Sequence, residues 1–132
     1  MTPWRFMDYV TPRGENPIQA WYAKQDPDVQ AALDFTIHQL KVTDDWVEPG
    51  CKQFSLLEHK HAGLSELRFW TSKRKFRVAG LYRPNHRDFI MFVGCEKWLR
   101  GIFKYKPTNA FDAAMKFKNA FEAGKGYAID HT

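Results

Sequence analysis

The sequence predicts a single α+β domain with an N-terminal strand, a two-helix hairpin, a three-stranded antiparallel meander and a C-terminal helix. Apolar residues recur at helical spacing up to residue 40, and three strand-like runs separated by short turns fill residues 64–95. Hydrophobic residues make up 44% of the chain and aromatic residues 16%, which is enough for a packed core. We expect one domain over residues 1–132, with its core in residues 4–123 and a frayed tail from Tyr127.

The first half of the chain predicts one strand followed by two helices. Residues 4–10 are mostly apolar and aromatic, and a turn at residues 11–14 ends this strand. Helix starts follow at Asn16-Pro17 and at Asp26-Pro27, each with a capping residue before a proline. Helical spacing relates the apolar residues of the second helix, Val29, Leu33, Ile37 and Leu40.

The second half predicts a meander of three strands at residues 64–70, 75–82 and 88–95. The turns between them, at residues 71–73 and 83–86, are short enough for antiparallel hairpins. Side chains alternate, so one face should be apolar and pack on the helices while the other carries Arg68 and Arg77. A last helix is expected over residues 109–122, ended by Gly124 and Gly126.

Positive charge is concentrated in one segment. Residues 60–106 hold twelve Lys or Arg against three acids, whereas residues 1–59 hold five basic and nine acidic side chains. A basic segment rich in aromatics is typical of a surface that binds phosphate groups, which makes nucleic acid the favoured partner. A solvated cationic face or a docking site for an acidic protein is the alternative.

The composition also predicts the compartment and the absence of cofactors. No window approaches the roughly 18 consecutive apolar residues of a membrane span, and the N-terminus lacks the apolar region of a signal peptide. We therefore expect a cytoplasmic protein without a membrane partner, with Cys51 and Cys95 as thiols. The basic segment has only three acids, Glu66, Asp88 and Glu96, so we expect chemistry without a metal or other cofactor.

Several motifs resemble the RelE/HigB/ParE toxin superfamily, in particular its phage-derived HigB-like branch. Residues 63–69, Gly-Leu-Ser-Glu-Leu-Arg-Phe, are similar to the family's Gly-Leu-x-Glu-Leu-Arg strand, and Phe76-Arg77-Val78 is similar to the strand that follows. Residues 92–94, then Lys97 and Lys106-Pro107, resemble the third strand and the start of the last helix. The resemblance covers about residues 4–123, but the stretch from 97 to 107 is longer than in the family.

This resemblance implies a RelE-like fold and the toxin of a type II toxin-antitoxin system, an endoribonuclease that cleaves mRNA on the ribosome. It also implies a cognate antitoxin, often a small helix-turn-helix protein. Members of the superfamily differ in target, so a ParE-like inhibitor of DNA gyrase and a catalytically silent member that binds RNA or a regulator remain alternatives.

The residues for cleavage are predicted from the resemblance and from the chemistry of RNA. The 2′-OH needs a base, the phosphorane needs cations and the leaving oxygen needs an acid. Arg77 matches the family's catalytic arginine and Arg68 a functional basic position, and two guanidinium groups suit phosphate; a surface pairing of Arg68 with Glu66 is the alternative. The other catalytic candidates are Lys97, Tyr105 and His61, and the RNA-binding candidates are Lys73, Arg74, Lys75, Arg83, Lys104 and Lys106.

Overall fold

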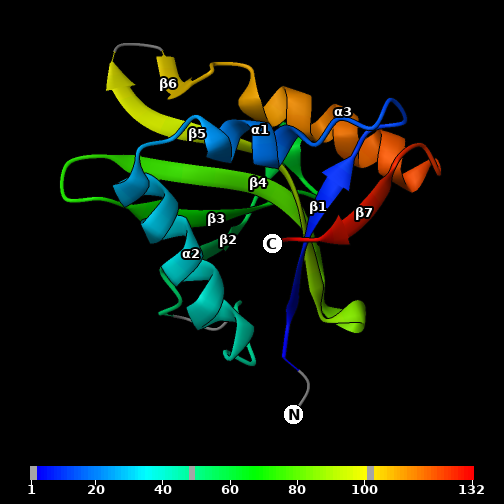
Figure 1. Ribbon diagram of the computed structural model, residues 1–132, viewed down its shortest axis with the longest axis horizontal. Coiled ribbons are helices and arrows are strands. Elements are labelled where there is room, and N and C mark those ends of the chain that lie inside the picture. Colours follow the sequence, from blue (N-terminus) through cyan, green and yellow to red (C-terminus); the bar gives the residue numbers. More distant parts are fainter. Residues whose placement is uncertain (1–2, 48–49, 101–102) are drawn as a thin grey trace.

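The computed structural model describes residues 3–47, 50–100 and 103–132, in which three helices accompany one mixed β-sheet (Figure 1). The helices are α1 (Pro17–Ala23), α2 (Pro27–Lys41) and α3 (Ala110–Glu122). The strands are β1 (Arg5–Val10), β2 (Phe54–Leu56), β3 (Ser65–Trp70), β4 (Lys75–Arg83), β5 (Asp88–Arg100), β6 (Phe103–Lys106) and β7 (Tyr127–Asp130). Two short 3-10 turns, η1 (His59–His61) and η2 (Pro84–His86), complete the described elements.

The strands lie in the order β2-β3-β4-β5-β1-β7, and β6 pairs with the C-terminal half of β5. β1 is parallel to β5, and the other described pairs are antiparallel. Because β5 runs for 13 residues, β1 pairs with its first part and β6 with its last part on the same edge. This arrangement carries β6 and the last part of β5 out beyond the centre of the sheet.

The predicted fold, a RelE-like fold with a three-stranded meander, is therefore wrong: the sheet has seven strands and is mixed. β2 has only three residues, too few for a period-2 pattern to appear, and β6 is basic and aromatic without a period. The tail that we expected to be frayed forms β7 instead and pairs with β1.

A buried contact between side chains explains why the C-terminal strand is ordered. Nδ1 of His131 lies 2.7 Å from Oδ1 of Asp8, and the two side chains are 9% and 1% exposed. The side-chain amides of Asn16 and Gln19 donate to the other oxygen of Asp8. The contact between His131 and Asp8 joins residues 123 positions apart, so no local sequence pattern reveals it.

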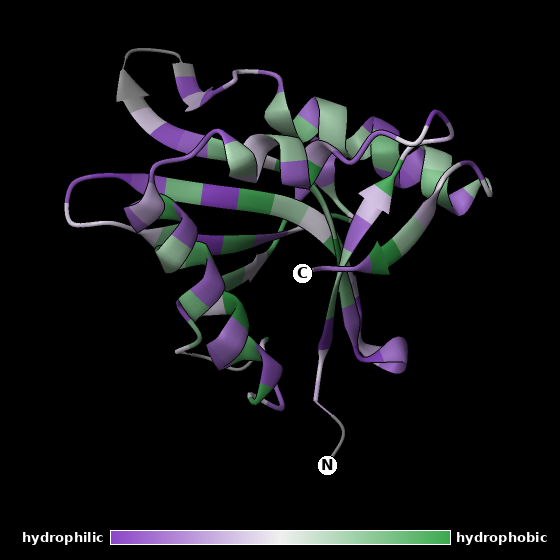
Figure 2. Ribbon diagram, in the orientation of Figure 1, coloured by the Kyte–Doolittle hydropathy of each residue, from purple (hydrophilic) through white to green (hydrophobic). Residues whose placement is uncertain are grey.

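Two apolar clusters lie on opposite faces of the sheet. The helices α1 and α2 cover one face, where Phe69, Phe76 and Val78 are buried with residues of α2. On α1, Trp21 lies so close to β5 that a Cβ on Gly94 would be 2.3 Å from its ring, which explains the glycine there. The helix α3 packs on the other face through Phe111 and Ala114. Figure 2 shows hydrophilic and hydrophobic residues alternating over the first part of β4, where successive side chains point to opposite faces of the sheet.

None of the helices in the described part of the chain combines the length and apolar character that a membrane crossing requires.

Candidate functional site

Four neighbouring strands bring charged and phenolic side chains to one face of the sheet, the face on which α3 packs. Arg68 on β3 is directly opposite Arg77 on β4, and Lys97 on β5 is opposite Tyr105 on β6. Glu66 precedes Arg68 by two residues and so points to the same face. We call this set (Glu66, Arg68, Arg77, Lys97 and Tyr105) the cationic face.

Glu66 is the buried centre of the cationic face. Its side chain is only 5% exposed, and its oxygens lie 3.0 Å from Nε of Arg77 and 3.6 Å from Nη2 of Arg68. Burial raises the pKa of the Glu66 carboxyl above its ordinary value, although Arg77 and Arg68 pull it down. Oε2 accepts no aligned hydrogen bond from the described residues, despite the short distance to Arg77. The result is a buried carboxylate, held between two guanidinium groups, with an increased affinity for a proton.

The two arginines differ in accessibility. Arg77 is 9% exposed and is fixed by a hydrogen bond of 2.9 Å from Nη1 to the carbonyl of Phe76. Arg68 is 41% exposed, so its guanidinium group is within reach of a ligand on the surface. A phosphate bound at this face would therefore meet one fixed and one accessible guanidinium group.

Lys97 and Tyr105 lie beside the arginines and are both half-buried. Burial lowers the pKa of the Lys97 ammonium group, and the positive charge of Arg77 lowers it further. Burial also raises the pKa of the Tyr105 phenol, with the charge of Glu66 as a second cause. Tyr105 therefore keeps its proton at neutral pH, and its phenol can donate a hydrogen bond.

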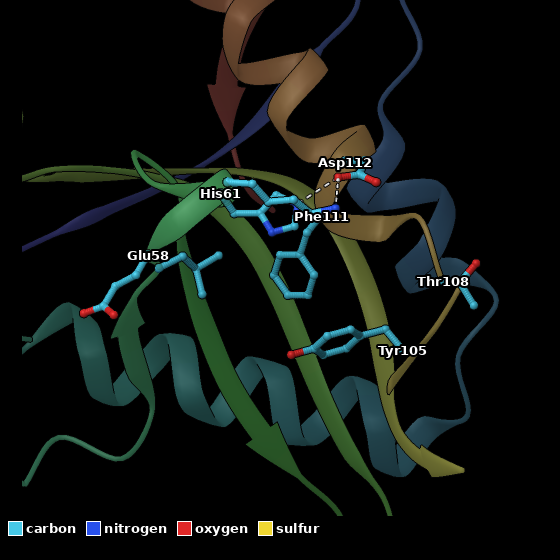
Figure 3. A pocket seen from close by; sticks show the side chains of 8 residues that line it. Glu58, His61, Tyr105, Thr108, Phe111 and Asp112 are labelled. Carbon is cyan, nitrogen blue, oxygen red and sulfur yellow. Dashed lines mark hydrogen bonds and ion pairs between the residues drawn. The ribbon is translucent and has the colours of Figure 1, made fainter. Parts of the chain in front are cut away.

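His61 lies at the edge of the same face, on η1. Its Nε2 is 2.8 Å from Oδ1 of Asp112 on α3, and its ring packs 5.7 Å from the ring of Phe111. Between these groups and Tyr105 is a cavity of about 150 Å³ (Figure 3). The structure thus brings all five predicted catalytic residues around one face and its adjoining cavity.

The six predicted RNA-binding residues do not form one surface. Lys75, on β4, is directly opposite Lys97 on β5 and points to the cationic face. Lys73 is exposed and lies in the turn before β4. Arg74 is bound to Glu96 through two contacts of 2.9 and 3.0 Å, and its guanidinium group lies over the ring of Phe76, on the opposite face.

The remaining three are also directed elsewhere. The register pairs Lys106 with Glu96 on the opposite face, where its ammonium group lies over the ring of Trp98. Lys104 is exposed and, as the neighbour of Tyr105 on β6, points away from the cationic face. Arg83 is at the far end of β4, bound to Asp88 at 2.7 and 2.8 Å.

Sequence reasoning missed two carboxylates. Glu66 was considered as a surface partner for Arg68 and as one of the three acids of the basic segment, yet it is buried between Arg68 and Arg77. Its position two residues before Arg68, on the polar side of an alternating strand, is the signal that could have placed it at the site. Asp112 carried no such signal, because η1 and α3 meet only in the fold.

Within the described residues, no group of three or more His, Cys, Asp or Glu side chains is arranged to hold a metal ion. Comparisons with models of known protein families, with curated proteins and with solved structures found no match. The candidate site therefore rests on the geometry of its own side chains.

Proposed function

We propose that the protein is a metal-independent endoribonuclease that cleaves RNA on the cationic face. The observation that carries the proposal is the buried Glu66 carboxylate, which lies between Arg68 and Arg77 with Lys97 and Tyr105 beside it. A base of raised pKa, several cations and a protonated phenol are the groups that cleavage of RNA by its own 2′-OH requires.

In the proposed reaction, Glu66 takes the proton of the 2′-OH, and the resulting oxygen attacks the adjacent phosphorus. A bond forms from the 2′-oxygen to phosphorus and the bond from phosphorus to the 5′-oxygen breaks, which leaves a 2′,3′-cyclic phosphate. Arg77, Arg68 and Lys97 stabilise the charge that develops on the phosphorane oxygens. Tyr105 or His61, both at the edge of this face, donates the proton that the leaving 5′-oxygen needs.

The proposed substrate is mRNA, cut in association with the ribosome, and the proposed role is that of a toxin restrained by a cognate antitoxin. Support for this part comes from the motifs at residues 63–69 and 76–78, which resemble the superfamily of such toxins, and from the basic character of residues 60–106. An antitoxin that covers the cationic face would block the substrate and the catalytic groups together.

The test is induced expression in a bacterial host of the wild type and Arg77→Ala, with Arg13→Ala as a matched control in an exposed loop. We expect the wild type and the control to arrest growth and leave new mRNA ends within coding regions, mapped by primer extension. Arg77→Ala should do neither. Purified wild type should cut mRNA when ribosomes are present. Ribosomes themselves need Mg²⁺, so the independence of cleavage from metal is tested separately, on free RNA in excess chelator.

The alternative targets give different results. Growth arrest without RNA cuts, together with inhibition of supercoiling by gyrase, would replace the ribonuclease with a gyrase inhibitor. RNA binding with a steep salt dependence but without cleavage or growth arrest would identify a catalytically silent binder.

A further inference from the structure

Two residues that line the cavity beside the cationic face, Tyr105 and His61, are the candidate proton donors in the chemistry proposed above, but the space between them has no part in that chemistry. The cavity's volume of about 150 Å³ would hold about five waters at ~30 Å³ each, which is less than a typical drug-sized site. This space suits a single flat ring system. The lining residues come from the β2–η1 segment, β6 and the start of α3, and are Leu57, Glu58, Lys60, His61, Tyr105, Thr108, Phe111 and Asp112.

The cavity walls are suited to the faces of an aromatic ring. Phe111 packs edge to face against Tyr105, with ring centres 4.7 Å apart, and His61 lies over its other side (Figure 3). Enzymes hold nucleic-acid bases that leave the stack against aromatic and apolar side chains, and a base in the cavity would lie against the open sides of these rings. Because Tyr105 belongs to both the cavity and the cationic face, a base in the cavity would be attached to a phosphate on that face.

The polar groups of the cavity include two carboxylates, those of Asp112 and Glu58. Asp112 is bound at Oδ1 by His61 and lies 3.5 Å from the ammonium group of Lys60. The bond from His61 and the charge of Lys60 lower the pKa of Asp112, which keeps it ionised and able to accept further hydrogen bonds at Oδ2. An ionised carboxylate accepts hydrogen bonds and donates none, so the nucleobase that it prefers must present N–H groups.

Guanine meets this requirement best. Its pairing edge carries two adjacent donors, N1–H and the amino group, which match the oxygens of carboxylates, and its O6 can accept from Lys60. Uracil presents two carbonyl oxygens and one N–H on the same edge, so it would place an acceptor against a carboxylate. Good contacts of this kind discriminate between bases by about tenfold or more.

We infer that the cavity is a nucleobase subsite that prefers guanine next to the phosphate on the cationic face. The inference rests on the proposed function for its substrate class, RNA, but its test does not require cleavage.

The experiment measures the affinity of the purified full-length protein for 3′-GMP and for 3′-UMP by calorimetry. The wild type should bind 3′-GMP about tenfold more tightly, and Asp112→Asn should lose most of this preference while its affinity for 3′-UMP changes little. Asp130→Asn makes the same change of charge on β7, outside the cavity, and should keep the preference. Thermal melts of both variants establish that they are folded.

Equal affinity for the two nucleotides, no binding of either at millimolar concentration, or an undiminished preference in folded Asp112→Asn would overturn the inference. If the preference is present and depends on Asp112 but no RNA is cut, the base subsite stands and the proposed catalysis fails. If RNA is cut without any bias for guanine, the ribonuclease stands and the base subsite fails.

Discussion

Replacement of Glu66 by glutamine tests the central feature of the site. The substitution removes the negative charge between Arg68 and Arg77 and leaves the shape of the side chain nearly unchanged. General-base catalysis contributes about 10²–10⁴ to a rate, so the rate of RNA cleavage should fall by at least about a hundredfold. The affinity for RNA should stay the same or rise, because a phosphate would meet the same cations without the nearby anion.

The same substitution has an expected effect on stability whose sign follows from the pKa. Burial raises the pKa of Glu66 in the folded protein, so the folded state binds the proton more tightly than the unfolded state does. Stability is then greatest below the unfolded pKa, about 4.3, and declines as pH rises from there through the folded pKa. Glutamine does not titrate, so relative to Glu66→Gln the wild type should lose stability as pH rises across this window.

Two measurements decide the matter, with Glu15→Gln as a control for the change of charge at an exposed position outside the site. Single-turnover cleavage of RNA gives the rate, and urea unfolding at a series of pH values from about 3.5 to 8 gives the difference in stability. A folded Glu66→Gln protein with a rate within tenfold of the wild type would refute the role of Glu66 as the base. Parallel stability curves for the two proteins would refute the raised pKa.

Two further predictions concern groups outside the proposed chemistry. Burial raises the pKa of the Cys95 thiol to about 12, so at pH 8 about one molecule in 10⁴ carries the Cys95 thiolate. A thiol reagent should therefore label the half-buried Cys51 and leave Cys95 unmodified until the protein unfolds. His131→Ala removes one partner of the buried Asp8 carboxylate, and because two side-chain amides still donate to that carboxylate we expect a loss of about 2 kcal/mol in urea unfolding. Asp130→Asn, at an exposed ion pair, should leave the unfolding midpoint unchanged, and an equal loss in both variants would contradict a specific role for His131.

Local patterns predicted the elements that are long and regular. The side chain of Asn16 accepts a hydrogen bond of 3.0 Å from the backbone N–H of Gln19, the N-cap contact that the Asn-Pro pair indicates. The helices α2 and α3 and the strands β3 and β4 also lie where periodicity placed them. The overall fold was predicted wrongly because β2, β6 and β7 have only three or four residues each, and because β7 pairs with β1 from the other end of the chain.

For the site, the sequence could predict only which face of the sheet a strand residue points to, from the alternation of side chains along the strand. Alternation placed Arg68 and Arg77 on the same face, and the register makes them direct neighbours. Lys106 pairs with Glu96, so its side chain points to the opposite face. A count of basic residues along the sequence could not reveal this. The burial of Glu66 depends on packing from several elements and had no signature in the sequence.

The cost of burying Glu66 has a consequence for the proposed catalysis. In the free protein the positive charges of Arg77 and Arg68 offset part of the desolvation of the carboxylate. A phosphate bound to the same guanidinium groups would bring its own negative charge close to Glu66 and neutralise some of that support. Like charge and loss of a counter-charge both raise the pKa of a carboxyl. Binding of RNA would therefore increase the proton affinity of Glu66 at the moment when a 2′-OH lies beside it, so that one pair of arginines both holds the phosphate and makes the adjacent carboxylate a stronger base.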